Sequence, residues 1–178
     1  GLKFHDTFGP YAFIIYTIAV GLRDLGMSMA PQNAFQTLLG LETLSLRMQK
    51  HVSNAKKIAN WLEKHPKVEK VTYAGLESSN YSNMAKTILP KGAGALFTIS
   101  LKKGYDACIE MINKLNLFSH VSNLGDTRSL IIHPASTVHR QLTEEQQINA
   151  GLAPNVVRLS IGIEDPKDLI NDLKQALE

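Results

Sequence analysis

Cysteine is almost absent from this chain, and so are long apolar runs. The single cysteine, Cys108, excludes an intrachain disulfide framework and a zinc site built from several thiolates. No apolar run reaches the roughly 18 residues that would cross a bilayer, because Tyr16 and Thr17 interrupt the stretch from Tyr11 to Leu22. No basic segment precedes that stretch, so it does not resemble a signal peptide. The sequence therefore predicts no membrane span and a reducing, cytoplasmic compartment.

Charge of one sign is not concentrated in any segment. The net charge is +3 and the pI about 9.0, but the densest basic region places Lys50, Lys57 and Lys64 seven residues apart, which is typical of one solvated helical face. No nucleic-acid-binding motif accompanies the charge, so we expect no nucleic-acid partner. The histidines form no recognised metal-ligand spacing, since His133 and His139 flank a proline, and we expect no metal site.

The first third of the chain has a helical pattern. Nothing in residues 1–9 introduces a secondary-structure element, so the start resembles the inside of a longer protein. Residues 11–24 are predicted to be helical and to end at Gly26, which can adopt the left-handed conformation of a helix C-terminus. Beyond Gln32 apolar residues recur every three or four positions until Pro66, which predicts one long helix over about 33–64. The stripe consists of Leu38, Leu41, Leu44, Met48, Val52, Ala55, Ala59 and Leu62.

After Pro66 short strands and helices alternate. This pattern predicts an α/β fold in the form of an α+β layer, a small sheet with covering helices. Thr143 and Gln146 fit a capping box at a helix start, and Asp165 before Pro166 fits another N-cap. Cys108 lies on an amphipathic helix and is expected to be buried. The predicted strands are 68–73, 95–101, 118–121, 129–132 and 156–161, and the predicted helices include 81–89 and 106–115.

Two segments stand out as possible sites. Small and polar residues flank a short apolar strand in residues 122–139, which is typical either of a loop that lines a site or of an ordinary strand connection. Gly92 and Gly94 form a Gly-x-Gly that precedes a strand instead of following one, which favours a turn over a dinucleotide site.

Arg158 lies in the most apolar strand of the C-terminal half. If that strand alternates, Arg158 and Ser160 share one face and the apolar residues share the other. A buried arginine needs a counter-anion, and its planar fork suits a carboxylate. The anion could belong to a ligand, or Arg158 could form a structural salt bridge with Glu164 or Asp165.

Three motifs together resemble the C-terminal signature of the Cys/Met-metabolism pyridoxal-phosphate enzymes, and the O-acetylhomoserine sulfhydrylase branch is the most similar. The resemblance extends over essentially the whole chain and includes Gly21–Gly26, Pro31–Phe35 and Gly40–Leu44. The signature itself comprises Asn123-Leu124-Gly125-Asp126, Ser129-Leu130-Ile131-Ile132-His133-Pro134-Ala135-Ser136-Thr137 and Val157-Arg158-Leu159-Ser160-Ile161-Gly162-Ile163-Glu164-Asp165.

The resemblance implies the C-terminal part of a fold-type I transferase with a long connecting helix. Residues 1–40 would end the large cofactor domain, 41–64 would form the interdomain helix, and 65–178 would form the small C-terminal domain. The cofactor would be pyridoxal 5'-phosphate. The family's cofactor-binding lysine lies upstream of Gly1, so we expect no catalytic residue and no certain cofactor-binding residue here, and an inactive isolated chain.

The resemblance also implies the substrate-binding residues. Arg158 matches the arginine that holds the substrate α-carboxylate, and Asn123 lies in the loop that meets that carboxylate, flanked by Ser122 and Leu124. Val138 departs from the family, which usually has threonine there.

The expected activity is the replacement of acetate in O-acetyl-L-homoserine by sulfide or a thiol, in a homo-oligomeric, tetrameric enzyme. Two alternatives stay open at this point. One is a cystathionine γ-synthase or γ-lyase type reaction on the same scaffold, and the other is a free-standing binding or assembly module without catalysis.

Overall fold

Residues 2–44 are largely helical, and none of these residues is buried. The computed structural model describes residues 2–178, which divide into two compact units, one ending at Leu44 and the other running from Ser45 to Glu178. Helical residues run without a break from Ala12 to Leu25, and Gly26 ends them with φ 64°, as expected. The first unit comprises α1 (Phe4–Phe8), a 3-10 turn (Gly9–Tyr11), α2 (Ala12–Tyr16), a π-helical turn (Thr17–Leu22), α3 (Arg23–Leu25) and α4 (Pro31–Glu42).

Large apolar side chains of the first unit are open to solvent. Phe13 is 79% exposed, Leu25 is 70% exposed and Phe35 is 60% exposed. Exposed apolar surface of this extent is typical of an interaction surface. Contact with another protein surface would remove these side chains from water, which is energetically favourable.

The prediction of one helix over 33–64 is wrong. α4 ends at Glu42 and α5 (Leu44–Glu63) begins two residues later. Thr43 lies between them with φ −104° and ψ 2°, outside the helical range. Two poor helix formers explain the break, since Gly40 costs about 1 kcal/mol relative to alanine and threonine loses side-chain freedom in a helix.

The second unit is built on a mixed five-stranded sheet with the strand order β1-β2-β5-β4-β3. All neighbouring strands are antiparallel except β3 and β4, which are parallel. The strands fall where the sequence predicted them. They are β1 (Val68–Thr72), β2 (Leu96–Leu101), β3 (Ser119–His120), β4 (Leu130–Ile132) and β5 (Val156–Ser160).

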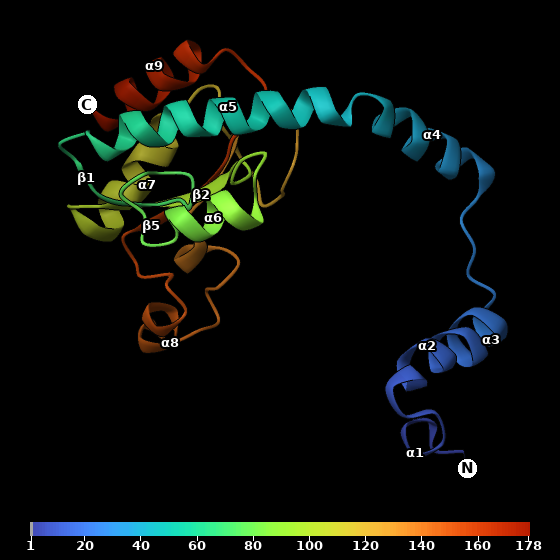
Figure 1. Ribbon diagram of the computed structural model, residues 1–178. Helices are drawn as coiled ribbons and strands as arrows, with labels where there is room; N and C mark the ends of the chain where they lie inside the picture. Colours follow the sequence, from blue (N-terminus) through green and yellow to red (C-terminus); the bar gives the residue numbers. More distant parts are fainter. Residues whose placement is uncertain (1) are drawn as a thin grey trace. The chain divides into compact units, whose positions relative to one another are not determined.

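One face of the sheet forms the hydrophobic core with three helices. Alternate residues of β2 and β5, among them Ile99 and Leu159, pack with buried side chains of α5, α7 (Gly104–Lys114) and α9 (Pro166–Leu177). Figure 1 shows α5 and α9 along the same side of this unit. The other face, which carries Thr98 and Arg158 as cross-strand partners, is not part of that core.

Shorter elements complete the unit. They are α6 (Ser82–Ile88), a 3-10 turn (Pro134–Ser136) and α8 (Glu144–Asn149). The capping box of Thr143 and Gln146 is confirmed, as is the cap of Asp165, whose carboxylate accepts the Lys167 amide at 2.7 Å. Within residues 2–178, no helix combines the length and the apolar character needed to span a membrane.

Burial of Cys108 yields a prediction on its reactivity. The side chain is fully buried, and desolvation raises the pKa of its thiol to about 12. Because the thiolate is the reactive form, the folded protein should leave this thiol unmodified by iodoacetamide at pH 8, while the protein in denaturant should react completely. Intact-mass spectrometry would measure both, and rapid alkylation of the folded protein would contradict the buried position.

Candidate functional site

Arg158 lies in the middle of the sheet on the face away from the core. It pairs with Thr98 of β2 on one side and with Ile132 of β4 on the other. The expected alternation of β5 is confirmed, because Val157 and Leu159 are buried in the core while Arg158 is half-buried on the opposite face.

The Arg158 guanidinium has no carboxylate partner within residues 2–178. Its one hydrogen bond there runs from Nη2 to the Ser122 hydroxyl at 3.3 Å. The salt bridge to Glu164 or Asp165 that the sequence left open does not form, because both acids bind backbone amides and a hydroxyl elsewhere. A guanidinium has five N–H donors, so most of its donor capacity is available to a ligand.

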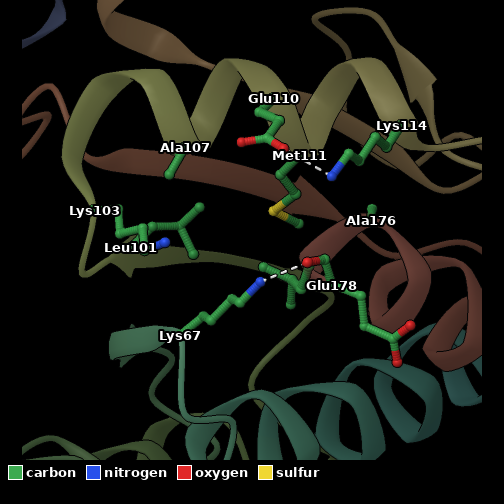
Figure 2. A pocket seen from close by; sticks show the side chains of 10 residues that line it. Lys67, Leu101, Lys103, Ala107, Glu110, Met111, Lys114, Ala176 and Glu178 are labelled. Carbon is green, nitrogen blue, oxygen red and sulfur yellow. Dashed lines mark hydrogen bonds and ion pairs between the residues drawn. The ribbon is translucent and has the colours of Figure 1, made fainter.

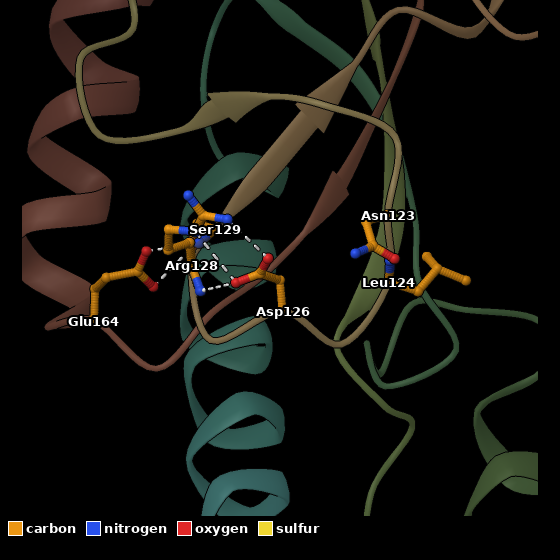
Figure 3. Close-up of polar contacts among 6 residues, drawn as sticks. All are labelled: Asn123, Leu124, Asp126, Arg128, Ser129 and Glu164. Carbon is orange, nitrogen blue, oxygen red and sulfur yellow. Dashed lines mark hydrogen bonds and ion pairs between the residues drawn. The ribbon is translucent and has the colours of Figure 1, made fainter. Parts of the chain in front are cut away.

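The loop between β3 and β4 brings the other predicted site residues to the same region. Ser122, Asn123 and Leu124 are all exposed, and the Asn123 carboxamide oxygen accepts the Leu124 amide at 2.8 Å. Figure 3 shows Asn123 and Leu124 at one end of this loop and Ser129 at the other. Ser122 contacts Arg158 directly, whereas no hydrogen bond joins Asn123 or Leu124 to Arg158 in the described chain.

An ion pair shapes the second half of the loop. The Arg128 guanidinium donates to the Asp126 carboxylate at 3.1 Å, and the Arg128 amide donates to the same group at 3.0 Å. These hydrogen bonds to Arg128 lower the pKa of Asp126 and raise that of Arg128. Both groups lie close to solvent, so the pair orders the turn more than it stabilises the fold.

A clasp of polar contacts joins the end of the loop to the segment after β5. Both Glu164 carboxylate oxygens accept from Ser129, one from its amide at 2.6 Å and one from its hydroxyl at 2.9 Å. The Ser129 hydroxyl in turn accepts the Gly162 amide at 2.8 Å. A side chain at Gly162 would overlap the backbone of Thr127 and Arg128, so the two segments lie in direct contact.

Helix α5 holds the same segment from its other side. The His51 Nδ1 donates to the Ile161 carbonyl at 2.6 Å, and the Asn54 amide donates to the carbonyls of Gly162 and Glu164 at 3.1 and 2.7 Å. Both side chains are buried, and their remaining polar atoms, His51 Nε2 and Asn54 Oδ1, have no partner in residues 2–178. Neither residue was predicted from the sequence, although His51 lies four positions before the buried Ala55 and Asn54 four positions before the buried Ile58, a helical spacing that was a usable signal.

A cavity of about 160 Å³ lies where β2 begins and β5 ends. Leu96 and Ser160 line it from the sheet, His51 lines it from α5, and Leu124 and Gly125 line it from the loop. No lysine lines this cavity, so none of its residues could bind pyridoxal phosphate covalently. The predicted site residue Leu124 and the β5 strand therefore meet at one place in the structure.

A second hollow, with a volume of about 120 Å³, lies away from these residues. Figure 2 shows its lining, which includes Lys67, Lys103 and Lys114. Lys114 is already paired with Glu110 at 2.8 Å, and Lys67 donates to the Glu178 carbonyl at 2.9 Å. None of the predicted site residues lines this hollow, and the Arg158 region remains the candidate site that the sequence predicts.

His133, which follows the loop and β4, has structural surroundings. His133 is fully buried, with its ring nitrogens 2.8 Å from the Ser136 hydroxyl and from the Pro154 carbonyl. These contacts hold the turn at Pro134–Ser136 in place. Val138, which follows the turn, is 47% exposed. The described residues 2–178 contain no group of three or more His, Cys, Asp or Glu side chains that could hold a metal ion.

Comparison with known proteins points to one family. The family model described as "Cys/Met metabolism PLP-dependent enzyme" matches residues 11–178. O-acetyl-L-homoserine sulfhydrylase 1 of Thermus thermophilus is 46% identical over 177 residues, which is 99% of this chain and 42% of that protein. L-methionine gamma-lyase of Fusobacterium nucleatum is 44% identical over 160 residues, covering 89% of this chain and 40% of that protein.

A solved structure has the same fold. The putative O-acetylhomoserine (thiol)-lyase of Campylobacter jejuni, crystallised with a pyridoxyl-lysine monophosphate, matches with a TM-score of 0.85 and 46% identity. The match covers 99% of this chain and 42% of that one. This chain therefore spans about two-fifths of the length of the relatives that it matches.

The Glu164–Ser129 clasp yields a stability prediction. In Glu164→Gln the new amide N–H₂ faces a donor from Ser129, so one half-buried contact is lost, and the free energy of unfolding should fall by about 1–3 kcal/mol. Glu77→Gln is the matched control, because Glu77 is exposed, and it should change stability by less than about 0.5 kcal/mol. Urea denaturation would measure both, and equal stabilities would show that the clasp contributes nothing.

Proposed function

Because this chain belongs to the Cys/Met-metabolism family of pyridoxal-phosphate-dependent enzymes, we propose that the whole protein is an O-acetyl-L-homoserine sulfhydrylase. It replaces the acetate of O-acetyl-L-homoserine with sulfide or a thiol and gives homocysteine or methionine. The 46% identity to a sulfhydrylase over nearly the whole chain supports this reaction.

The observation that carries the proposal is the Arg158 guanidinium without a carboxylate partner in the described chain. Its Ser122 contact holds one edge of the fork, and its remaining donors are free to bind the α-carboxylate of the amino-acid substrate with two parallel hydrogen bonds. Asn123 and Leu124 lie in the same loop and are exposed, so their groups can meet the same carboxylate. In this role Arg158 orients the amino acid, and the acetate that is replaced lies at the other end of the substrate.

The residues described here fit the substrate better than the cofactor. Pyridoxal phosphate supplies an electron sink for the bonds that break in such enzymes. No lysine lines the cavity beside Ser160 and Leu124, so the groups that hold the cofactor belong to the rest of the protein. We expect this chain alone to be inactive for that reason.

We also propose a domain assignment and an assembly for the whole protein. Residues 1–40 end the large domain, 41–64, which include α5, connect the two domains, and 65–178 form the small domain. The exposed apolar side chains of the first unit support burial against other parts of the protein or against other subunits, and a cytoplasmic homo-oligomer, a tetramer, is the assembly that we expect.

The reaction class can be tested on the protein that contains this chain. Borohydride reduction followed by intact-mass measurement should show a mass well above 19.6 kDa with a reduced pyridoxal-phosphate adduct. Incubation of O-acetyl-L-homoserine with sulfide should yield homocysteine. Cystathionine formed from cysteine as acceptor would indicate a cystathionine γ-synthase, and breakdown of methionine a γ-lyase, for which the Fusobacterium relative is the precedent. A mass near 19.6 kDa without an adduct would favour a free-standing binding module.

Substitution of Arg158 tests the substrate role. In the intact protein Arg158→Ala should raise KM for O-acetyl-L-homoserine about 100-fold, because a charge-assisted bidentate contact is lost. The KM for sulfide should change little, since sulfide has no carboxylate. Steady-state kinetics with each substrate varied in turn would measure both values.

Arg128→Ala is the control for loss of an arginine near the loop. Arg128 is already paired with Asp126, so its removal should leave the KM for O-acetyl-L-homoserine within about threefold of the wild type. Unchanged saturation kinetics in Arg158→Ala would remove Arg158 from the substrate site.

A further inference from the structure

The aim of Arg158 depends on how the end of β5 is held. Arg158 lies three residues before Ile161, and β5 ends at Ser160. The Ile161 amide donates to the Ala95 carbonyl at 2.9 Å, which extends the pairing with β2 by one residue. Beyond that bond, the contacts of the Ile161 and Gly162 carbonyls run to α5.

Two side chains of α5 make those contacts. His51 donates to Ile161 and Asn54 donates to Gly162 and Glu164, so three of the four carbonyls in 161–164 are bound to one helix face. His51 is 2% exposed and Asn54 is 1% exposed. Loss of the donor to a buried carbonyl lowers the stability of the fold more than loss of the donor to an exposed one, because water cannot take the place of the missing donor.

The same short segment also holds the loop that contacts Arg158. Glu164 and Gly162 bind Ser129, and the Ile163 amide donates to the Thr127 carbonyl at 2.9 Å. The loop then leads back to Ser122, the partner of Arg158. His51 also lines the cavity whose other walls are Ser160, Leu124 and Gly125. One helix face thus supports both the strand that carries Arg158 and the loop that contacts it.

We propose that His51 is a positioning residue, which aims Arg158 and its loop at the substrate carboxylate through the hydrogen bond to the Ile161 carbonyl. The proposal rests on the proposed function, in which Arg158 binds that carboxylate. In this role His51 acts on Arg158 through the backbone of residues 158–161. The Nε2 atom of His51 has no partner within residues 2–178. The positioning of Arg158 therefore depends on the hydrogen bond that Nδ1 donates.

The test compares two inhibitors that differ only in a carboxylate, L-norvaline and n-butylamine, on the whole, cofactor-loaded protein. The ratio of their inhibition constants measures how well the carboxylate is held, independently of turnover. His51→Leu removes the donor, and the preference for L-norvaline should fall about tenfold. His51→Asn places an amide N–H where Nδ1 was, and its preference should stay within about twofold of the wild type.

Ile58→Val is the control for weaker helix packing. Ile58 is fully buried on the same helix but has no contact with residues 161–164 through a hydrogen bond. It should lower the melting temperature and leave the inhibitor ratio unchanged. If His51→Leu does not fold, Asn54→Ala is measured in its place and should lower the ratio in the same way.

The outcomes separate the inference from the proposed function. A wild-type protein that does not prefer L-norvaline over n-butylamine would overturn the carboxylate site itself. A wild-type preference that His51→Leu retains would overturn only the role of His51. Equal losses in His51→Leu and Ile58→Val, or failure of both the His51→Leu and Asn54→Ala proteins to fold, would show that these contacts serve general stability, which also overturns it.

Discussion

Both carboxylate oxygens of Glu164 accept hydrogen bonds from Ser129. These two bonds determine which charged groups near the loop are paired with one another. Glu164 lies six positions after Arg158 and is a natural candidate for its counter-ion. Because the acid is held on the backbone and hydroxyl of another segment, Arg158 keeps its charge without an acidic neighbour in the described chain. Glu164 therefore closes the loop, and the Arg158 guanidinium has no carboxylate partner in the described chain, which agrees with its proposed role in binding a carboxylate.

The strand pattern and the capping residues were readable from the sequence, because they depend on neighbours within one element. The alternation of β5 predicted that Arg158 and Val157 lie on opposite faces of the strand. The pair Thr143 and Gln146 predicted the start of α8. The hydrogen bonds of Glu164 could not be predicted from the sequence, since its partner Ser129 lies 35 residues away and only the folded loop brings the two residues together. The Ser122–Arg158 contact is likewise a tertiary fact that spacing along the chain does not contain.

The apolar stripe of the predicted long helix did not predict well which of its residues are buried. Its early members, such as Met48, are largely exposed, while the buried face of α5 is centred on Ala55 and Ile58 and includes His51 and Asn54. Polar residues on a buried helix face were overlooked because hydrophobicity patterns reward only apolar positions. Their partners are carbonyl groups about 110 positions further along the chain, so their purpose became evident only with the structure. The break at Thr43 was overlooked for a related reason, because a stripe can continue across a short interruption.

The burial of Cys108 has a consequence for the proposed reaction with sulfide. Polysulfides, which form when sulfide is oxidised, transfer sulfur to accessible thiolates and convert them into persulfides. In this chain the only thiol lies fully buried on α7, and desolvation keeps its pKa near 12, so almost none of it is ionised at neutral pH. The one thiol of this chain is therefore protected from persulfidation by the oxidised sulfur species that accompany sulfide, the acceptor in the proposed reaction.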